Sequence, residues 1–231
     1  MSERAPDPCT DEADESPPQI VLPGWRSALD PSRALAVGPH GIPRDRVEAV
    51  QRDRLIDAFV QVVAERGYES AGVKVICKRA GVAYSTFYEL FESKEQLFLA
   101  AYDAGVATLI EAARTAPVDP GSTDLRSKIE ASLGTVLRAL ADNPAFARFF
   151  AIEVHKAGPA TQERVDATFE TAFAMYARTQ VAAKRSLPQA DVGPLVIGGA
   201  YTRILFYIRN GRTDELPDLL PVLTSFVLFD F

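Results

Sequence analysis

The sequence predicts an all-α protein with a small N-terminal three-helix unit and a larger C-terminal helical domain. Apolar residues recur at the helical period in one segment after another, whereas no alternating apolar and polar run exceeds four residues. Proline and glycine separate these segments, as at Asn143-Pro144, Gly158-Pro159 and Asn210-Gly211. A chain of this pattern folds as packed helices without a sheet.

Size and charge exclude some classes of protein. The chain has 231 residues, of which 47% are apolar, enough for one large domain or two modest ones. Its net charge of −6 argues against a generally basic protein that coats nucleic acid. Residues 44–97 hold nine basic and nine acidic side chains. A positive face there requires the fold to sort the cations onto one side.

The two cysteines, Cys9 and Cys77, lie far apart in the sequence, so a disulfide framework is not expected and a reducing cytoplasm fits. No apolar run reaches the length of a membrane span. The N-terminus is acidic and rich in proline, unlike a signal peptide. We therefore expect a cytoplasmic protein without membrane contact.

Residues 1–43 form an N-terminal extension. The first 19 residues carry mostly acidic groups and prolines and are predicted to be disordered, because they bury too little apolar surface to offset chain entropy. Residues 20–43 contain Trp25 and Leu29 among several turn residues. This part is predicted to pack loosely or to become ordered on a partner.

Four helices are predicted between Arg44 and Ala116. The first begins after Pro43, which suits a first helical turn, and ends at Gly67, which suits a left-handed cap. Short helices follow over 73–79 and 82–90, separated by a turn at Ala80-Gly81-Val82. Ser93 caps a longer helix that runs to about residue 116. The remaining helices are predicted over 122–142, 144–156, 159–186, 191–210 and 214–229.

Helix 82–91 has an apolar side and a polar side. Phe87, Leu90 and Phe91 share one side and are predicted to face a small core. Tyr84, Ser85, Tyr88 and Glu89 then point outward with Thr86 at the margin, where hydroxyl groups can bond phosphates or base edges. Lys94 follows at the start of the next helix, where an ammonium group and helix N–H groups can meet one phosphate. The alternative is an ordinary helix pair with an aromatic core.

The pattern of residues 44–104 resembles the N-terminal domain of the tetracycline-repressor (TetR) family. The resemblance lies in Gly67-Tyr68, Val73, Ile76, Ala80-Gly81-Val82, Thr86-Phe87-Tyr88, Phe91, Ser93-Lys94-Glu95 and Leu97. It implies a homodimeric repressor that places helix 82–91 in the major groove of a palindromic double-stranded operator and is released by a small-molecule ligand.

By the same resemblance, residues 44–104 form the DNA-binding domain and residues 105–231 the ligand-binding and dimerisation domain. Tyr84 and Ser85 are expected to approach bases, and Thr86, Tyr88 and Lys94 to approach phosphates. Arg44 and Glu89 complete the predicted DNA-binding set. Gly72, Ala83 and Leu90 depart from the family pattern, which often has Thr, Ser and His or Tyr at these positions. The first two departures remove helix caps, and all three are expected to weaken DNA binding.

The second half is rich in aromatic residues at helical spacing, which more often indicates a core than a ligand cavity. An apolar or aromatic effector pocket is nevertheless consistent with the resemblance. Its expected lining residues are Leu137, Phe149, Glu153, Phe173, Tyr176 and Tyr201. Helices 191–210 and 214–229 are expected to build a two-fold interface, with Gly198 and Gly199 allowing close approach; packing within the chain is the alternative.

Nothing in the sequence indicates catalysis. The two histidines, His40 and His155, lie in unrelated segments, and no known nucleotide-binding, hydrolase or zinc motif is present. We expect no enzyme activity, no metal and no cofactor. Two alternative functions remain open: a small-molecule-binding protein or enzyme with a vestigial helix-turn-helix, and a helical module whose helix-turn-helix binds protein.

Overall fold

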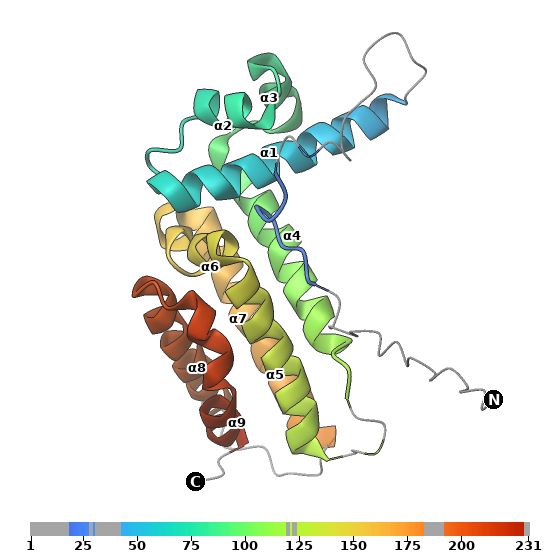
Figure 1. Cartoon of the computed structure of the whole chain (residues 1–231), viewed down its shortest axis with the longest axis vertical. Helices are drawn as coiled ribbons and strands as arrows, with labels where there is room; N and C mark the ends of the chain where they lie inside the picture. Colours follow the sequence, from blue (N-terminus) through green and yellow to red (C-terminus); the bar gives the residue numbers. More distant parts are fainter. Residues whose placement is uncertain are drawn as a thin grey trace, which may run out of the picture.

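The computed structural model of the chain describes residues 19–27, 30, 43–118, 121, 124–182 and 192–228, and every regular element within these ranges is helical. The all-α prediction is confirmed. A small head of three helices lies at one end, and α4, α5 and α7 run lengthwise below it with α8 and α9 along one flank (Figure 1). The head consists of α1 (Arg44–Arg66), α2 (Val73–Ala80) and α3 (Tyr84–Leu90). The body consists of α4 (Lys94–Arg114), α5 (Leu125–Asp142), α6 (Pro144–Ala151), η2 (Glu153–Lys156), α7 (Pro159–Ala182), α8 (Val192–Arg209), η3 (Thr213–Leu219) and α9 (Leu220–Leu228).

Head and body share one continuous apolar core. The ring of Phe59 in α1 packs edge-on against Phe98 in α4 and Phe149 in α6, with centroid distances of 5.9 and 5.8 Å. Phe98 and Phe149 stack on each other at 4.2 Å. All three side chains are fully buried, and such aromatic pairs contribute beyond the area they bury. The head is therefore held by packing as well as by the covalent link through α4.

Helix α4 runs from the head into the body and crosses the boundary expected at residue 104. The side chain of Ser93 accepts a bond from the N–H of Gln96 at 3.1 Å, as the sequence predicts for the cap of this helix. Gly105 in α4 faces the ring of Phe146 from α6, and a Cβ atom at this position would overlap the Cζ atom of that ring. The absence of a side chain at Gly105 makes room for the Phe146 ring.

Two helices expected to be continuous are interrupted. The segment 144–156 divides into α6 and η2, and the segment 214–229 begins with η3 before α9 starts at Leu220. Pro217 lies inside η3 and Pro221 near the start of α9. Proline lacks the N–H group that a continuous α-helix requires, and its ring clashes with the preceding turn.

Part of the N-terminal extension is packed against the head and body. Leu22 is only 1% exposed and belongs to the main core, whereas Val21 and Trp25 in the same segment are exposed. The expected disorder of residues 1–19 falls almost entirely on residues outside the described ranges, as do Cys9, Leu29 and His40. Cys77 is buried, and burial raises the pKa of its thiol. Within the described ranges, no helix combines the length and hydropathy needed to cross a membrane.

Candidate nucleic-acid interface

Helix α3 is held from behind by its aromatic residues and begins after a glycine corner. Gly81 adopts a left-handed conformation with φ of 62°, and the N–H of Val82 donates to the carbonyl of Cys77 at 3.1 Å. Phe87 is fully buried and Phe91 is 2% exposed, with their rings 6.0 Å apart. A helix fixed in this way presents its other side to solvent in one orientation.

The exposed side of α3 carries the residues that its periodicity predicts. Tyr84 and Tyr88 are 47% and 49% exposed, Ser85 and Glu89 are exposed, and Thr86 is half-buried. The hydroxyl oxygens of the two tyrosines lie 3.2 Å apart, and their rings meet edge to face at 5.2 Å. The hydrogen bond with Tyr84 raises the pKa of the Tyr88 hydroxyl. The pair therefore offers one remaining O–H donor and several lone pairs at a single point on the helix.

Neither short helix of the head has a side-chain cap. Gly72 precedes α2 and Ala83 precedes α3, and neither helix receives a side-chain hydrogen bond at its N-terminal end. The sequence predicts these missing caps. The first-turn N–H groups of both helices are left without a capping oxygen from the side chain at that position.

Lys94 lies at the start of α4 and points back to the end of α1. Its ammonium donates to the carbonyl of Tyr68 at 2.8 Å and lies 4.0 Å from the centre of the Tyr68 ring. Burial lowers the pKa of Lys94. An ammonium has three donors, so this bond leaves two for another acceptor. The predicted phosphate contact stays a prediction.

Two arginines of α1 lie beside α3. Arg44 forms a hydrogen-bonded ion pair with Glu48 at 2.7 Å, which is the main cause of its raised pKa, and the negative charge of Glu89 adds to it. Arg52 lies 4.4 Å over the ring of Phe91 and donates to the carbonyl of Leu90 at 3.4 Å. Arg52 was not among the predicted DNA-binding residues, because its position is defined by the crossing of α1 and α3 rather than by a motif.

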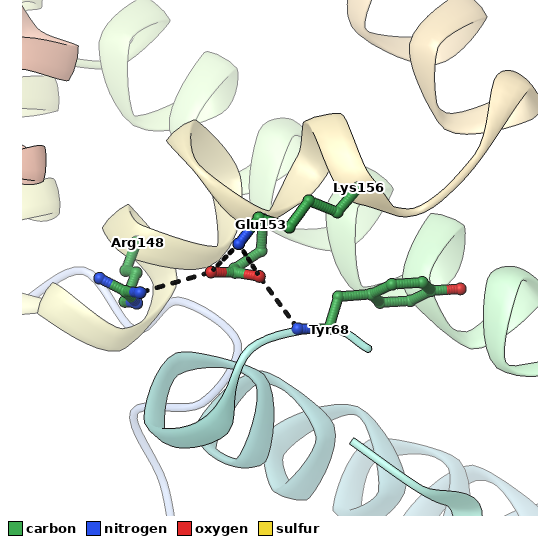
Figure 2. Close-up of polar contacts among 4 residues, drawn as sticks. All are labelled: Tyr68, Arg148, Glu153 and Lys156. Carbon is green, nitrogen blue, oxygen red and sulfur yellow. Dashed lines mark hydrogen bonds and ion pairs between the residues drawn. The ribbon is translucent and has the colours of Figure 1, made fainter. Parts of the chain in front are cut away.

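One buried carboxylate of the body binds the backbone just after α1. Glu153 in η2 is fully buried and accepts a bond from the N–H of Tyr68 at 2.9 Å (Figure 2). Its other contacts are with Lys156 at 3.2 and 3.3 Å and Arg148 at 3.4 Å, both half-exposed. Glu153 is one of the six residues predicted for an effector pocket, and here its carboxylate is engaged in joining head and body.

An apolar pocket of about 250 Å³ lies between α4, α5, α6 and α7. Its lining residues are Val106, Leu109, Ile110, Ala113, Val136, Phe150, Thr168, Ala172 and Met175. None of the six predicted pocket residues is among them, although Phe150 is the ring neighbour of Tyr201 at 6.5 Å. The pocket is defined by where four helices leave space, which a count of aromatic residues does not reveal.

The other five predicted pocket residues fall in separate surroundings. Leu137 and Phe149 are fully buried in the main core. Phe173 packs on Gly193 of α8, and the hydroxyl of Tyr176 donates to the carbonyl of Val227 at 3.2 Å. The Tyr201 hydroxyl donates to the carbonyl of Ala151 at 3.3 Å, and burial raises its pKa to about 12. The five are thus distributed over core packing and helix contacts.

The head also matches a known family of sequences. The model of bacterial regulatory proteins of the tetR family matches residues 55–101, which cover the second half of α1, all of α2 and α3 and the start of α4. Residues 55–101 therefore form a TetR-type N-terminal domain. The TetR match includes Gly81, Phe87 and Phe91, the residues that position and anchor the exposed helix.

Two curated TetR relatives are similar to parts or most of the chain. The transcriptional activator FasR of Mycolicibacterium smegmatis is 35% identical over 92 residues, which are 40% of this chain and 39% of FasR. The transcriptional repressor KstR of Mycobacterium tuberculosis is 22% identical over 207 residues, 89% of this chain and 88% of KstR. The stretch aligned with FasR is therefore less than half of either protein.

Solved structures share the fold beyond the head. The fatty acid degradation regulator FadR of Bacillus halodurans has a TM-score of 0.67 at 20% identity, covering 85% of this chain and 98% of FadR. The FadR of Bacillus subtilis in complex with stearoyl-CoA has a TM-score of 0.63 at 17% identity, covering 77% of this chain and 97% of that chain. The helical body therefore has the same architecture as the bodies of these TetR-like regulators.

Proposed function

We propose that this chain is a homodimeric transcriptional repressor that reads a palindromic DNA operator with α3 and releases it when an apolar ligand binds the body. The observation that carries the proposal is the exposed face of α3. Tyr84, Ser85 and Tyr88 stand outward on a helix that Phe87 anchors, which suits contact with a major groove. A cytoplasmic location follows from this role.

FasR and KstR have opposite effects on transcription, because FasR is an activator and KstR a repressor. We propose repression because it needs the simpler mechanism of the two. A dimer bound to its operator blocks access to the DNA, and a ligand that alters the spacing of the heads releases the dimer. A reporter fused to the chain's own upstream DNA tests this. Deleting the gene for the protein should raise expression of the reporter. A fall in expression would indicate an activator instead.

A homodimer is proposed from the exposed apolar residues of the last two helices. Leu195 and Phe206 on α8 and Val222 on α9 are 70%, 48% and 59% exposed. Gly199 packs against Phe226 within the chain, whereas a Cβ atom on Gly198 would have no neighbour within 4 Å. Packing within the chain therefore accounts for Gly199, and Gly198 belongs to the surface that a second copy would cover.

The effector is proposed to be apolar because the pocket between α4, α5, α6 and α7 has an almost wholly apolar lining. Acyl-CoA thioesters are the first class to test, since stearoyl-CoA is bound by the similar FadR of Bacillus subtilis. A thermal-shift series of saturated acyl-CoAs should show a rise in melting temperature that depends on chain length. Free coenzyme A is the control and should give none.

The deciding experiment is a mobility shift on the chain's own upstream DNA. The protein should bind that duplex more tightly than a random duplex of equal length at moderate salt, because base contacts by α3 add to the phosphate contacts. Equal affinity for both duplexes would contradict the proposal. Adding the acyl-CoA that stabilises the protein should then release the operator.

A further inference from the structure

We infer that residues 20–26, here called the strap, and Asn143 form a positioning element that sets the orientation of the head on the body. The strap contacts α1 at one end and the junction of α5 and α6 at the other. The inference deepens the proposed function, since it concerns how α3 is held for DNA. Three groups of contacts carry it.

The first group joins the strap to the body through Asn143. This side chain is 2% exposed and stands at the N-terminal end of α6, yet it makes no capping bond to that helix. Its amide nitrogen donates to the carbonyl of Ile20 at 3.1 Å and to that of Ala139 at 2.7 Å. Its amide oxygen accepts from the N–H of Leu22 at 3.4 Å. Asn143 thus ties the strap backbone to the end of α5 in place of capping α6.

The second group joins the strap to the head through α1. The N–H of Gly24 donates to the carboxylate of Asp57 at 2.6 Å. The side-chain amide of Gln61 donates to the carbonyls of Gly24 and Arg26, both at 3.0 Å. Asp57 and Gln61 lie one helical turn apart on α1, so the strap follows the surface of this helix.

The third group is steric. Gly24 has φ of 85°, and a Cβ atom there would come within 2.6 Å of the Cγ1 atom of Val60. Leu22 next to it is buried in the main core. The strap backbone therefore lies tightly against α1, and a displacement of α5 and α6 is expected to reach α1 through it.

The contacts act in series, from Asn143 through the strap backbone to the pair Asp57 and Gln61 on α1. Because α1 packs against both α2 and α3, a rotation of α1 reorients the reading helix. A link in series has a signature that simple packing lacks: cutting either end breaks it, and cutting both does no further harm. Independent stabilising contacts would instead give additive effects.

A double-mutant cycle tests this signature on the full-length protein. The variants are Gln61→Ala, Asn143→Ala and the double variant, with Gln51→Ala as a control on α1 away from the strap. Dissociation constants are measured for two forms of the upstream operator, the native one and one with a single base pair inserted between its half-sites. The readout is the ratio of the dissociation constant for the inserted operator to that for the native operator. Each single variant should lower this ratio by roughly threefold to tenfold, in the range by which residues outside both sites change coupling. The double variant should match the single variants.

Two outcomes of the cycle would overturn the inference. One is a double variant whose loss equals the product of the two single losses. The other is a ratio unchanged from wild type in Gln61→Ala, which alters only a half-buried side chain and should not disturb folding. The control Gln51→Ala should keep the wild-type ratio.

Hydrogen exchange separates the strap from the proposed function, because it needs no DNA. Gln61→Ala should speed exchange of the Leu22 amide, whose acceptor is Asn143 at the far end of the strap. Protection of Leu22 at the wild-type level would overturn the inference even if operator binding is confirmed. Faster exchange without any operator preference in the wild-type protein would keep the strap as a link and reject the DNA-binding role.

Discussion

The carboxylate of Glu153 accepts a hydrogen bond from the backbone N–H of Tyr68 at 2.9 Å, and this bond joins the body to the residue after Gly67, the C-cap of α1. The carbonyl of the same Tyr68 accepts from Lys94 at 2.8 Å. Both backbone polar groups of Tyr68 are therefore held, the N–H by η2 and the carbonyl by α4. These two bonds add polar contacts to the aromatic packing that holds the head on the body.

Removing the Glu153 carboxylate should destabilise the protein. Glu153→Ala leaves the Tyr68 N–H without its acceptor and should lower the free energy of unfolding by about 2 kcal/mol. Arg148 and Lys156 add less, because both are half-exposed and can turn to water. Glu153→Gln should lose about half as much, since its amide oxygen can still accept.

Urea unfolding of these Glu153 variants provides the measurement, and Glu163→Gln on the exposed part of α7 serves as the control. The control should change stability by less than about 0.5 kcal/mol, as is usual for surface substitutions. Equal losses in Glu153→Gln and Glu153→Ala would show that the bond to Tyr68 is not the important contact.

Gly105→Ala should destabilise the protein although alanine is the better helix former. Helix propensity alone predicts a gain of about 1 kcal/mol. The new methyl group would overlap the ring of Phe146, and overpacking of this kind costs about 1–3 kcal/mol. Thermal unfolding should show a lower midpoint. The control Ala104→Gly, on the exposed side of the same helix, should lose about 1 kcal/mol through propensity alone.

Stability should fall at alkaline pH partly because of Tyr201. Burial raises its pKa from 10.0 to about 12 in the folded protein. Between these values the folded state keeps a proton that the unfolded state has lost, so stability declines as pH rises through this window. Tyr201→Phe removes this loss, and urea unfolding on both sides of pH 10 should show a shallower decline than in wild type. An unchanged slope would mean that Tyr201 does not titrate in this window.

Lys94→Ala separates two roles of this side chain. Loss of the bond to the Tyr68 carbonyl should lower the free energy of unfolding by about 1 kcal/mol. If the remaining donors meet a phosphate, the slope of log affinity against log salt should also become shallower by about 0.9 for every duplex. A stability loss with an unchanged slope would make Lys94 a structural residue only.

Leu195→Arg should convert the proposed dimer to a monomer. Leu195 is the most exposed of the apolar residues on α8 and α9, and a charge there would be buried without a partner between two copies. Sedimentation of the variant and of Val181→Arg, an exposed apolar position on α7 instead, makes a matched pair. Monomers from Leu195→Arg with dimers from Val181→Arg support the interface. If both variants remain dimers, the dimer interface lies elsewhere.

Several features of the head were predictable because they depend on local interactions. The spacing of Phe87 and Phe91 placed them in the core, and their burial left Tyr84 and Tyr88 exposed. Gly81 as a left-handed corner follows from the same short stretch of chain. Helical period, capping residues and glycine at positive φ all act within a few residues, so one sequence contains the information.

The position of a pocket in the body was not predictable from the sequence. Aromatic residues predicted to line a pocket include Phe149, which is buried between α1 and α4, and Tyr176, which bonds the carbonyl of Val227. Periodicity shows which residues face inward but does not distinguish a filled core from a cavity. That difference depends on how far apart neighbouring helices lie.

The amino-acid sequence by itself determined that this protein is helical, that its head contains a helix-turn-helix and that α3 exposes hydroxyl groups. Only the tertiary structure decided that Glu153 holds the end of α1 and that Asn143 holds the strap. The physical reason is sequence separation. These bonds join residues 85, 121 and 123 positions apart, and their formation depends on the relative placement of whole helices rather than on any local preference.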